Sequence, residues 1–390
     1  MMFWSNISKI FFAELKKILT DKGSFLIMII GAVSYSVIYG LIYCHQVVRE
    51  VPVGVIDNDN SAFSREVIRN IDSTEQIKIK MHLNTMKEAV DEYSKDKIRA
   101  FIIIPHDFEK DILSGKGADV VLEADSSYMI IYRQVYTGVM SVVSTLSAKA
   151  AVVRNTINAK DFNKAYAMQV PFNYVQVPLF NPVSSYENYV FPVILLLILQ
   201  QTMLVGVGLL NGRRREKEDK FCEFTDNPTQ IVLGRGLAYV ALYLIYGSIY
   251  LLMYPYWFGY GLYINLPLMF FVLLLFLFST AFLSQALGIF FNNKEDSLLA
   301  LVMSSITLVF LAGVVWRRED IPLLLNFVAD FIPSTRGVDA LVRINQMGAN
   351  LSQVLESVLW LVGLTILFYV LANLTVKKLV EEKKNLPEQN

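Results

Sequence analysis

Residues 189–210 read YVFPVILLLILQQTMLVGVGLL and contain no charged side chain. The hydrocarbon core of a bilayer is about 30 Å thick, and an α-helix crosses it in about 20 residues. Three arginines, Arg213, Arg214 and Arg215, follow closely, as is typical of the cytoplasmic end of a membrane helix. This stretch therefore predicts a membrane-spanning helix, and the class of the whole chain depends on how many more such stretches it holds.

Five further stretches have a similar length and apolar character. They cover residues 24–44, 237–257, 266–291, 298–316 and 354–376. The first is not expected to be a cleaved signal peptide, because its apolar run is about 20 residues long and no small-residue cleavage site follows it. The sequence thus predicts a polytopic α-helical membrane protein with six transmembrane helices.

Lysine and arginine resist translocation, so their positions in short loops predict the orientation of the chain. Basic residues precede the first span, follow the second and follow the sixth, which indicates that these three segments share the cytoplasmic side. The N-terminal segment 1–23 and the tail 377–390 are then both cytoplasmic, at the inner (plasma) membrane. Residues 45–188 are expected outside, as is the segment 317–353, whose four arginines are a mild exception.

The composition excludes several classes of function. Hydrophobic residues make up 54% of the chain and charged residues 18%, which is too apolar for an ordinary soluble enzyme and too charged for membrane throughout. The 35 basic and 35 acidic residues balance, so nothing favours a nucleic-acid partner. The cysteines, Cys44 and Cys222, fall on opposite predicted sides, and no Cys/His cluster predicts a metal site.

Residues 45–188 show a different pattern from the spans. Short β-rich runs at 51–56, 77–81, 100–104 and 120–123 alternate with amphipathic stretches. This alternation predicts an extracytoplasmic α/β domain inserted between the first and second spans. The segment 57–61, Asp-Asn-Asp-Asn-Ser, is a conceivable calcium loop, but it lacks the glycine and distal glutamate of an EF-hand. Helix capping is the plainer interpretation.

A long helix is predicted over 128–158, because apolar residues recur there every three or four positions without a proline. At about 1.5 Å per residue its length would be about 45 Å. A seventh span is the competing interpretation, but Arg133 and Lys149 bracket only 15 residues, several of them serine or threonine. We therefore expect this helix to pack against its own domain or a partner.

Several short segments occur in an order that is informative as a whole. They are VPVGVIDNDNS (51–61), SRE (64–66), IIIP (102–105) and DF (107–108), then AGVVW (312–316), IP (321–322), IPST (332–335) and DALVR (339–343). Their order and spacing resemble the ABC-2 type transporter permeases, in the branch with a large extracytoplasmic domain between the first and second transmembrane helices. The resemblance covers essentially the whole chain. It departs at Lys220-Phe221, where the family commonly has Gly-Thr.

The resemblance implies a transport subunit that works as a homodimer or beside a related permease, with a separate cytoplasmic ABC ATPase. A periplasmic adaptor and an outer-membrane duct are further partners that it suggests, and membrane lipid surrounds the spans. ATP and Mg are expected on the ATPase and no cofactor on this chain. The chain has no Gly-x-x-x-x-Gly-Lys-Ser/Thr loop, and residues 114–117 lack the upstream glycine and the hydroxyl after the lysine.

The cytoplasmic loop 211–234 is the candidate coupling segment, because a short helix there could transmit motion from an ATPase. The candidate coupling residues are Arg215, Glu216, Glu218, Phe221, Glu223, Phe224 and Pro228. A simple anchor to lipid headgroups also explains the arginine triplet. Residues 3–19 have the pattern of an interfacial amphipathic helix and are expected to lie along the inner leaflet beside the ATPase.

The third span carries tyrosines at helical spacing, and few other polar groups are at membrane depth. The candidate substrate path consists of Tyr239, Tyr243, Tyr246, Tyr250, Tyr254, Gln200, Gln201 and Gln285. The alternatives for the tyrosine face are a dimer seam and ordinary helix packing. No acid or base within the spans suggests a proton relay, and so apolar a path favours amphiphilic or hydrophobic cargo. Gly206, Gly208 and Gly212 permit close helix approach.

Residues 322–331 and 335–345 are each too short to span a bilayer and too apolar for a free loop, which predicts a shallow helical hairpin at the outer surface. The hairpin residues singled out are Pro322, Pro333, Thr335 and Arg343. The hairpin either gates release as a lid or plugs the bundle.

The function that these features favour is the permease subunit of an ATP-driven exporter, moving an amphiphilic or hydrophobic substrate outward. The alternative is a membrane-anchored binding or scaffold protein whose external domain recruits a partner. An enzyme is not expected, because the chain has no HExxH or GxSxG motif.

Overall fold

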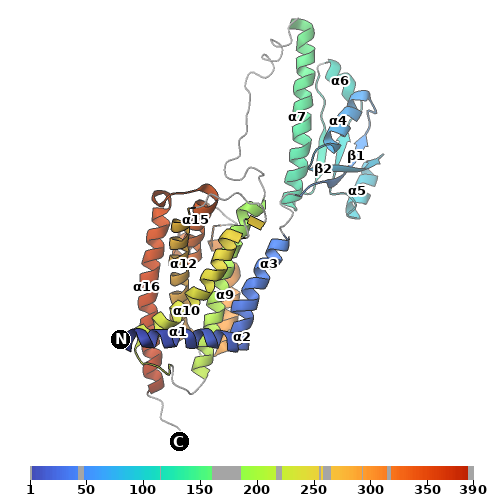
Figure 1. The fold of residues 1–390 in the computed structure, drawn as a ribbon. Coiled ribbons are helices and arrows are strands. Elements are labelled where there is room, and N and C mark those ends of the chain that lie inside the picture. Colours follow the sequence, from blue (N-terminus) through green and yellow to red (C-terminus); the bar gives the residue numbers. More distant parts are fainter. Residues whose placement is uncertain are drawn as a thin grey trace. The chain divides into compact units, whose positions relative to one another are not determined.

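The computed structural model describes residues 2–42, 48–114, 116–159, 186–216, 222–253, 256–257, 265–291, 293–313 and 318–384 (Figure 1). The chain forms two compact units. One comprises residues 1–46 and 178–390, and the other residues 47–177.

The unit formed by residues 47–177 contains a four-stranded sheet with the order β2-β1-β3-β4. The strands are β1 Val51–Asp57, β2 Ile77–Leu83, β3 Ala100–Ile104 and β4 Val121–Ala124. β1 is parallel to β2 and β3, whereas β4 is antiparallel to β3. All four strands begin within one residue of the positions that the sequence predicts, because alternating β-branched residues mark strands well.

Four helices cover the two faces of this sheet: α4 Ala62–Asp72, α5 Met86–Ser94, α6 Phe108–Ser114 and α7 Met129–Ala159. Val53 and Val55 of β1 share a core cluster with α4, α6 and α7, whereas Ile56 belongs to a second cluster with α5. Successive strand residues point to opposite faces, so β1 serves both layers. The result is a three-layer α/β arrangement.

The Asp-Asn-Asp-Asn-Ser segment caps helices, as its residue types predict. Ser61 Oγ accepts the Ser64 N–H at 2.9 Å and so caps α4. The carboxylate of Asp59 accepts the N–H groups of Phe108 and Glu109, at the start of α6. These bonds connect the end of β1 to two helices and use the carboxylate that a calcium site would need.

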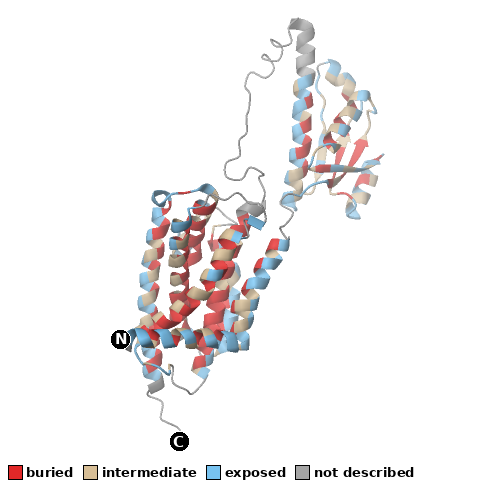
Figure 2. Cartoon of the chain, viewed as in Figure 1, coloured by how far each residue is buried: buried red, intermediate tan, exposed pale blue. Residues whose placement is uncertain are grey.

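The long helix α7 packs against its own sheet. Val135, Val139, Val142 and Leu146 are buried in the core that they share with β1 and α4, and Figure 2 shows buried residues recurring along α7. The helix was expected to pack against its own domain or against a partner. It packs against its own domain.

The other unit is helical. Its elements are α1 Met2–Thr20, α2 Lys22–Phe25, η1 Leu26–Gly31, α3 Ala32–Ile42, α9 Tyr186–Glu216, α10 Pro228–Ser248, η2 Ile249–Met253, α12 Leu266–Ala286, η3 Leu287–Phe290, α13 Lys294–Leu311, η4 Arg318–Asp320, α14 Leu323–Asp330, α15 Pro333–Met347 and α16 Leu351–Lys384. Among the described residues, five helical runs are long and apolar enough to cross a bilayer: Lys22–Leu41, Val190–Glu216, Pro228–Met253, Leu266–Ala286 and Leu351–Glu382. The chain is thus a polytopic helical membrane protein.

The predicted span 298–316 corresponds to α13, which is not among these five. Its 18 residues begin with Lys294, Glu295 and Asp296. These three charges make α13 less apolar than the five helical runs above. α13 lies antiparallel to α9: a Cβ on Gly208 would meet Leu301, and one on Gly212 would meet the backbone of Asn293. Residues 314–316 lie outside the described part of the chain.

The core of the helical unit surrounds α9, most of whose apolar part is buried. Glycines on α9 permit this packing as expected, because a Cβ on Gly206 would lie 2.1 Å from Met28 Cγ of η1. The helix α1 crosses one end of the bundle, and α15 lies at the opposite end (Figure 1). The inner face of α1 contacts α10, where a Cβ on Gly234 would lie 2.7 Å from Ile10 Cγ2.

Candidate functional site

The end of α9 connects four other helices through four consecutive side chains. Arg213 pairs with Asp21, the N-cap of α2, and Arg214 pairs with Glu14 of α1. Arg215 Nη2 lies 3.4 Å from Glu382 Oε2 of α16, and Glu216 Oε1 accepts the Lys294 N–H of α13 at 2.8 Å. Successive residues of a helix are about 100° apart around its axis, so residues 213–216 reach neighbours on every side.

Glu14 is the centre of this site. Its carboxylate accepts hydrogen bonds from Arg214 Nη2 and Tyr239 Oη, and Arg235 Nε lies 3.7 Å from Glu14 Oε2. Glu14, Arg214, Arg235 and Tyr239 are 3%, 8%, 3% and 0% exposed. A second bond from Arg214, Nη1 to Asn211 Oδ1 at 2.9 Å, holds its guanidinium in place. We call these four residues the Glu14 cluster.

Electrostatics make the Glu14 cluster a strong connection between helices. Burial alone would raise the pKa of Glu14, but the charges of Arg214 and Arg235 and the hydrogen bonds to the carboxylate outweigh burial and keep this pKa below its usual value. Burial and the charge of Arg214 also lower the pKa of nearby Lys17. Separating the helices would leave buried charges without their partners, which is costly in free energy. The Glu14 cluster therefore holds α1, α9 and α10 together.

A cavity of about 40 Å³ joins the Glu14 cluster to the loop before α10. It is lined by Ile10, Ala13, Glu14, Lys17, Cys222, Glu223, Phe224 and Arg235. Glu223 and Phe224 were candidate coupling residues, and both are exposed at its edge. Pro228 is the first residue of α10, where Asn227 Oδ1 accepts the Thr229 N–H at 3.0 Å. Glu218 and Phe221 lie outside the described residues.

Sequence reasoning missed Glu14 and Arg235. The apolar and basic positions of residues 3–19 predict a helix lying on lipid, and this prediction gives Glu14 no role. The buried face of α1 is Ile7, Ile10, Glu14 and Ile18, at spacings of three, four and four. An acidic residue at helical spacing among isoleucines indicates that the acid is buried against a partner. This signal can be read from the sequence of residues 7–18.

The tyrosine face of α10 lies inside the bundle and joins three helices. Tyr239 donates to Glu14 of α1, and Tyr243 Oη donates to Thr202 Oγ1 of α9 at 3.0 Å. Tyr250, which continues this face in η2, donates from Oη to the Ala32 carbonyl of α3 at 2.6 Å. Tyr246 stacks edge-on against Tyr243, with ring centroids 5.7 Å apart. This arrangement favours helix packing among the interpretations of the tyrosine face. Tyr254 lies outside the described residues.

The three glutamines of the candidate path also bind neighbouring helices. Gln200 Oε1 accepts the Ser334 N–H of α15 at 2.7 Å, and Gln201 donates to the Leu301 carbonyl of α13. Gln285 Nε2 lies 3.3 Å from the Val232 carbonyl of α10. Each amide thus contacts the backbone of a neighbouring helix with one of its polar atoms, whereas Gln200 Nε2, Gln201 Oε1 and Gln285 Oε1 are buried with no hydrogen-bond partner among the described residues.

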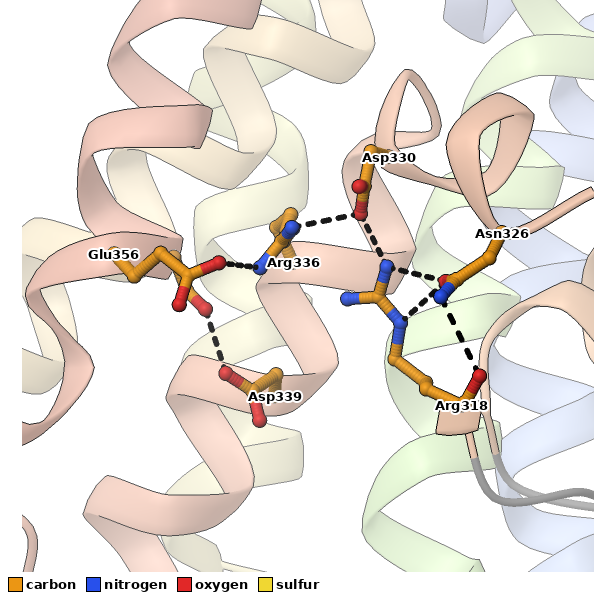
Figure 3. A network of polar contacts seen from close by, with 7 residues as sticks. Arg318, Asn326, Asp330, Arg336, Asp339 and Glu356 are labelled. Carbon is orange, nitrogen blue, oxygen red and sulfur yellow. Dashed lines mark hydrogen bonds and ion pairs between the residues drawn. The ribbon is translucent and has the colours of Figure 1, made fainter. Parts of the chain in front are cut away.

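A second polar network occupies the opposite end of the bundle (Figure 3). Asp330 of α14 pairs with Arg318 and, at 2.8 Å, with Arg336 of α15. Arg336 Nη1 lies 2.9 Å from Glu356 Oε1 of α16, and its guanidinium lies 5.1 Å from the centre of the Trp360 ring. This network, which we call the Asp330 network, joins η4, α14, α15 and α16.

The predicted hairpin is present as the two short helices α14 and α15. Pro322 directly precedes α14 and Pro333 begins α15, where proline's missing N–H costs little. Thr335 is buried in the first turn of α15, and Arg343 pairs with Asp339 at 2.7 Å. Ten of the fifteen residues of α15 are buried, which favours a plug over a mobile lid for this helix.

Comparison with known proteins identifies a family for this chain. Residues 22–374 match a family described as ABC-2 family transporter protein. A search of curated proteins gives no match. The family match covers the α/β unit and the helical unit from residue 22 to residue 374, and it leaves out α1, which carries Glu14, and the last ten residues of α16. The chain therefore belongs to the ABC-2 transporter family and is a multi-pass membrane permease, a transport subunit rather than a catalytic one.

Proposed function

We propose that this chain is the membrane subunit of an ATP-driven exporter and that the Glu14 cluster receives the movement of a separate ATPase. The observation that carries the proposal is the end of α9, where four consecutive residues bind α1, α2, α13 and α16. The adjoining loop brings Glu223 and Phe224 to the surface beside Glu14. A protein that presses on this loop or on α1 would act on all these helices together.

The proposed topology has six spans, with α13 as the fifth. Ion pairs bring the starts of α2 and α13 and the ends of α9 and α16 together at one end of the bundle. The Asp330 network contains the start of α16, so the chain crosses the bundle between Lys294 and α14. Apolar residues fill α13 after its charged first turn. An even number of spans is consistent with both termini in the cytoplasm and the α/β unit outside.

Two helices are suited to carry movement between the two ends. α9 runs from the Glu14 cluster to Gln200, which binds the first turn of α15. α16 runs from Glu382, beside Arg215, to Glu356 in the Asp330 network, a length of about 39 Å at about 1.5 Å per residue. If either helix moves as a rigid body at one end, its other end should therefore displace the hairpin residues that it binds.

The remaining parts of the proposal concern cargo and partners. The core of the helical unit is largely apolar. Six polar side chains of the candidate path hydrogen-bond to other helices: Tyr239, Tyr243, Tyr250, Gln200, Gln201 and Gln285. This arrangement favours an amphiphilic or hydrophobic cargo over ions or sugars. The route for such a cargo then lies between permease subunits or along the bundle surface. A second permease, identical or related, and an ABC ATPase in the inner membrane complete the proposed transporter.

Co-purification of the tagged chain with the ATPase, from cells that express both, tests the loop's role. Glu223→Gln and Phe224→Ala should each reduce the ATPase recovered, because both side chains are exposed beside the Glu14 cluster. Glu295→Gln is the matched control, an exposed carboxylate at the same end of the bundle. Full recovery of the ATPase with both loop variants would contradict the proposal.

A further inference from the structure

The α/β unit contains a cavity of about 180 Å³ between α4, α6 and α7. Phe63 and Val67 of α4, Phe108 and Ile112 of α6, and Val143 and Leu146 of α7 line it. Phe108 and Leu146 are 3% and 7% exposed, so the cavity reaches into the core of the unit. An apolar hollow of this size in a small domain is unusual, because protein interiors leave few voids larger than a water molecule.

Specific contacts fix the position of α6 beside α4 at this cavity. Asp59 accepts the N–H groups of Phe108 and Glu109 at 3.0 and 3.2 Å, which fixes the start of α6 beside the loop that leads into α4. The rings of Phe63 and Phe108 stack with centroids 6.0 Å apart. These contacts oppose collapse of the walls onto one another.

The size and lining of the cavity suit an apolar occupant. An apolar cavity of about 150 Å³ stays dry and holds a molecule the size of benzene, whereas a buried water needs two to four polar partners. Ser147 carries the one side-chain hydroxyl among the described lining residues. A ring or a short alkyl chain would therefore fill the cavity better than water.

The mouth of the cavity is polar and accessible. Gly117 and Ser147 are its exposed lining residues. Lys149 of α7 pairs with Glu66 of α4 at 3.2 Å, and both side chains reach solvent. Glu66 directly precedes the lining residue Val67, and Lys149 is two positions after the lining residue Ser147. A ligand that fits both parts would place an apolar end inside the cavity and a charged or dipolar end at this rim. Such a ligand is an amphiphile.

We propose that this cavity binds the apolar end of a small amphiphile, with its head group at the rim formed by Glu66, Ser147 and Lys149. The site would give the α/β unit a role in recognising cargo. Only the identification of the amphiphile as cargo rests on the proposed export function. Binding itself needs neither an ATPase nor transport, so the two proposals can fail separately.

Photolabelling of the full-length protein in lipid nanodiscs tests the site. The probe is a phosphocholine whose eight-carbon chain ends in a diazirine, and labelled peptides are identified by mass spectrometry. Labelling should saturate, map to residues 63–67, 108–112 and 143–147, and be displaced by unlabelled octyl phosphocholine. Labelling of the wild-type protein that neither saturates nor favours these segments would overturn the proposal.

Two substitutions that fill the cavity give an independent check. Ala118→Leu and Val143→Phe should weaken saturable labelling by about tenfold or more and leave the melting temperature unchanged or raised, because filling a cavity is stabilising. Val90→Phe is the control, since Val90 is exposed on α5, across the sheet from the cavity. Folded Ala118→Leu and Val143→Phe proteins that label as the wild type does would refute the site. If both misfold, the competition measurement on the wild type decides.

Discussion

At the scale of single residues, Glu14 determines how the inner helices meet. One carboxylate faces the guanidinium groups of Arg214 and Arg235, and the tyrosine of α10 completes its hydrogen bonds. The residue types were visible in the sequence, but their proximity was not, since Glu14 and Arg214 are 200 positions apart. Amphipathic periodicity assigns faces to a helix, and only tertiary packing assigns partners to those faces.

Replacing Glu14 by glutamine keeps the size of the side chain and removes its charge. Arg214 and Arg235 then lose the buried carboxylate that they share, and we expect a loss of about 3–5 kcal/mol in the free energy of unfolding. Thermal unfolding of the purified protein measures this loss. The double variant Glu14→Gln/Arg214→Gln should recover part of it, because the pair interacts directly. A single variant that melts like the wild type would show that the pair contributes little.

The same pair predicts a pH dependence. The pKa of Glu14 is lowered in the folded protein, so its stabilising effect is complete above its unfolded pKa of about 4.3 and is lost as the pH falls through the lower folded value. The difference in melting temperature between wild type and Glu14→Gln should be constant from neutral pH to about pH 5 and shrink below about pH 4. A difference that grows on acidification would contradict the assigned charge.

At the scale of elements, length and periodicity predicted more than side-chain partners. The four strands, the helix α7 and the pair α14 and α15 follow from local patterns, because alternation and helical spacing are local properties. The start of α13 does not, because its first turn is charged and is positioned by Glu216 of α9, which accepts the Lys294 backbone N–H and lies 3.8 Å from Lys294 Nζ. The tyrosine face of α10 was predictable as a face, but the groups that its hydroxyls bind come from α1, α9 and α3.

The contact between α9 and α13 gives a prediction at this scale. A Cβ on Gly212 would lie 2.5 Å from the Asn293 carbonyl oxygen, and backbone cannot move aside as a side chain can. Gly212→Ala should therefore destabilise the protein by about 1–3 kcal/mol. Gly363→Ala on α16 is the control, because nothing lies within 4 Å of its added Cβ, and it should be neutral or stabilising by up to about 1 kcal/mol. Equal melting temperatures for the two variants would argue against the close contact.

At the scale of the whole molecule, the helical unit has a polar network at each end and an apolar interior between them. The Glu14 cluster and its neighbours gather the ends of α9 and α16, and the Asp330 network gathers α14, α15 and the start of α16. Family resemblance could predict a transport subunit from sequence, and the family match agrees. Neither network was predicted. The residues of the Glu14 cluster are up to 225 positions apart. The partners in the Asp330 network are at most 20 positions apart, but they come from four separate helical elements whose packing the sequence does not give.

The central claim is that the Glu14 cluster passes the state of the ATPase to the hairpin. Electron–electron distance measurements on the reconstituted complex test it, with spin labels at Leu324 of α14 and Leu355 of α16, both exposed, and with Cys44 and Cys222 replaced by alanine. Addition of ATP and vanadate should change the distance distribution in the wild type. Glu14→Gln should bind the ATPase yet lose this change, and Glu295→Gln should keep it. A Glu14→Gln complex that changes distance as the wild type does would contradict the account.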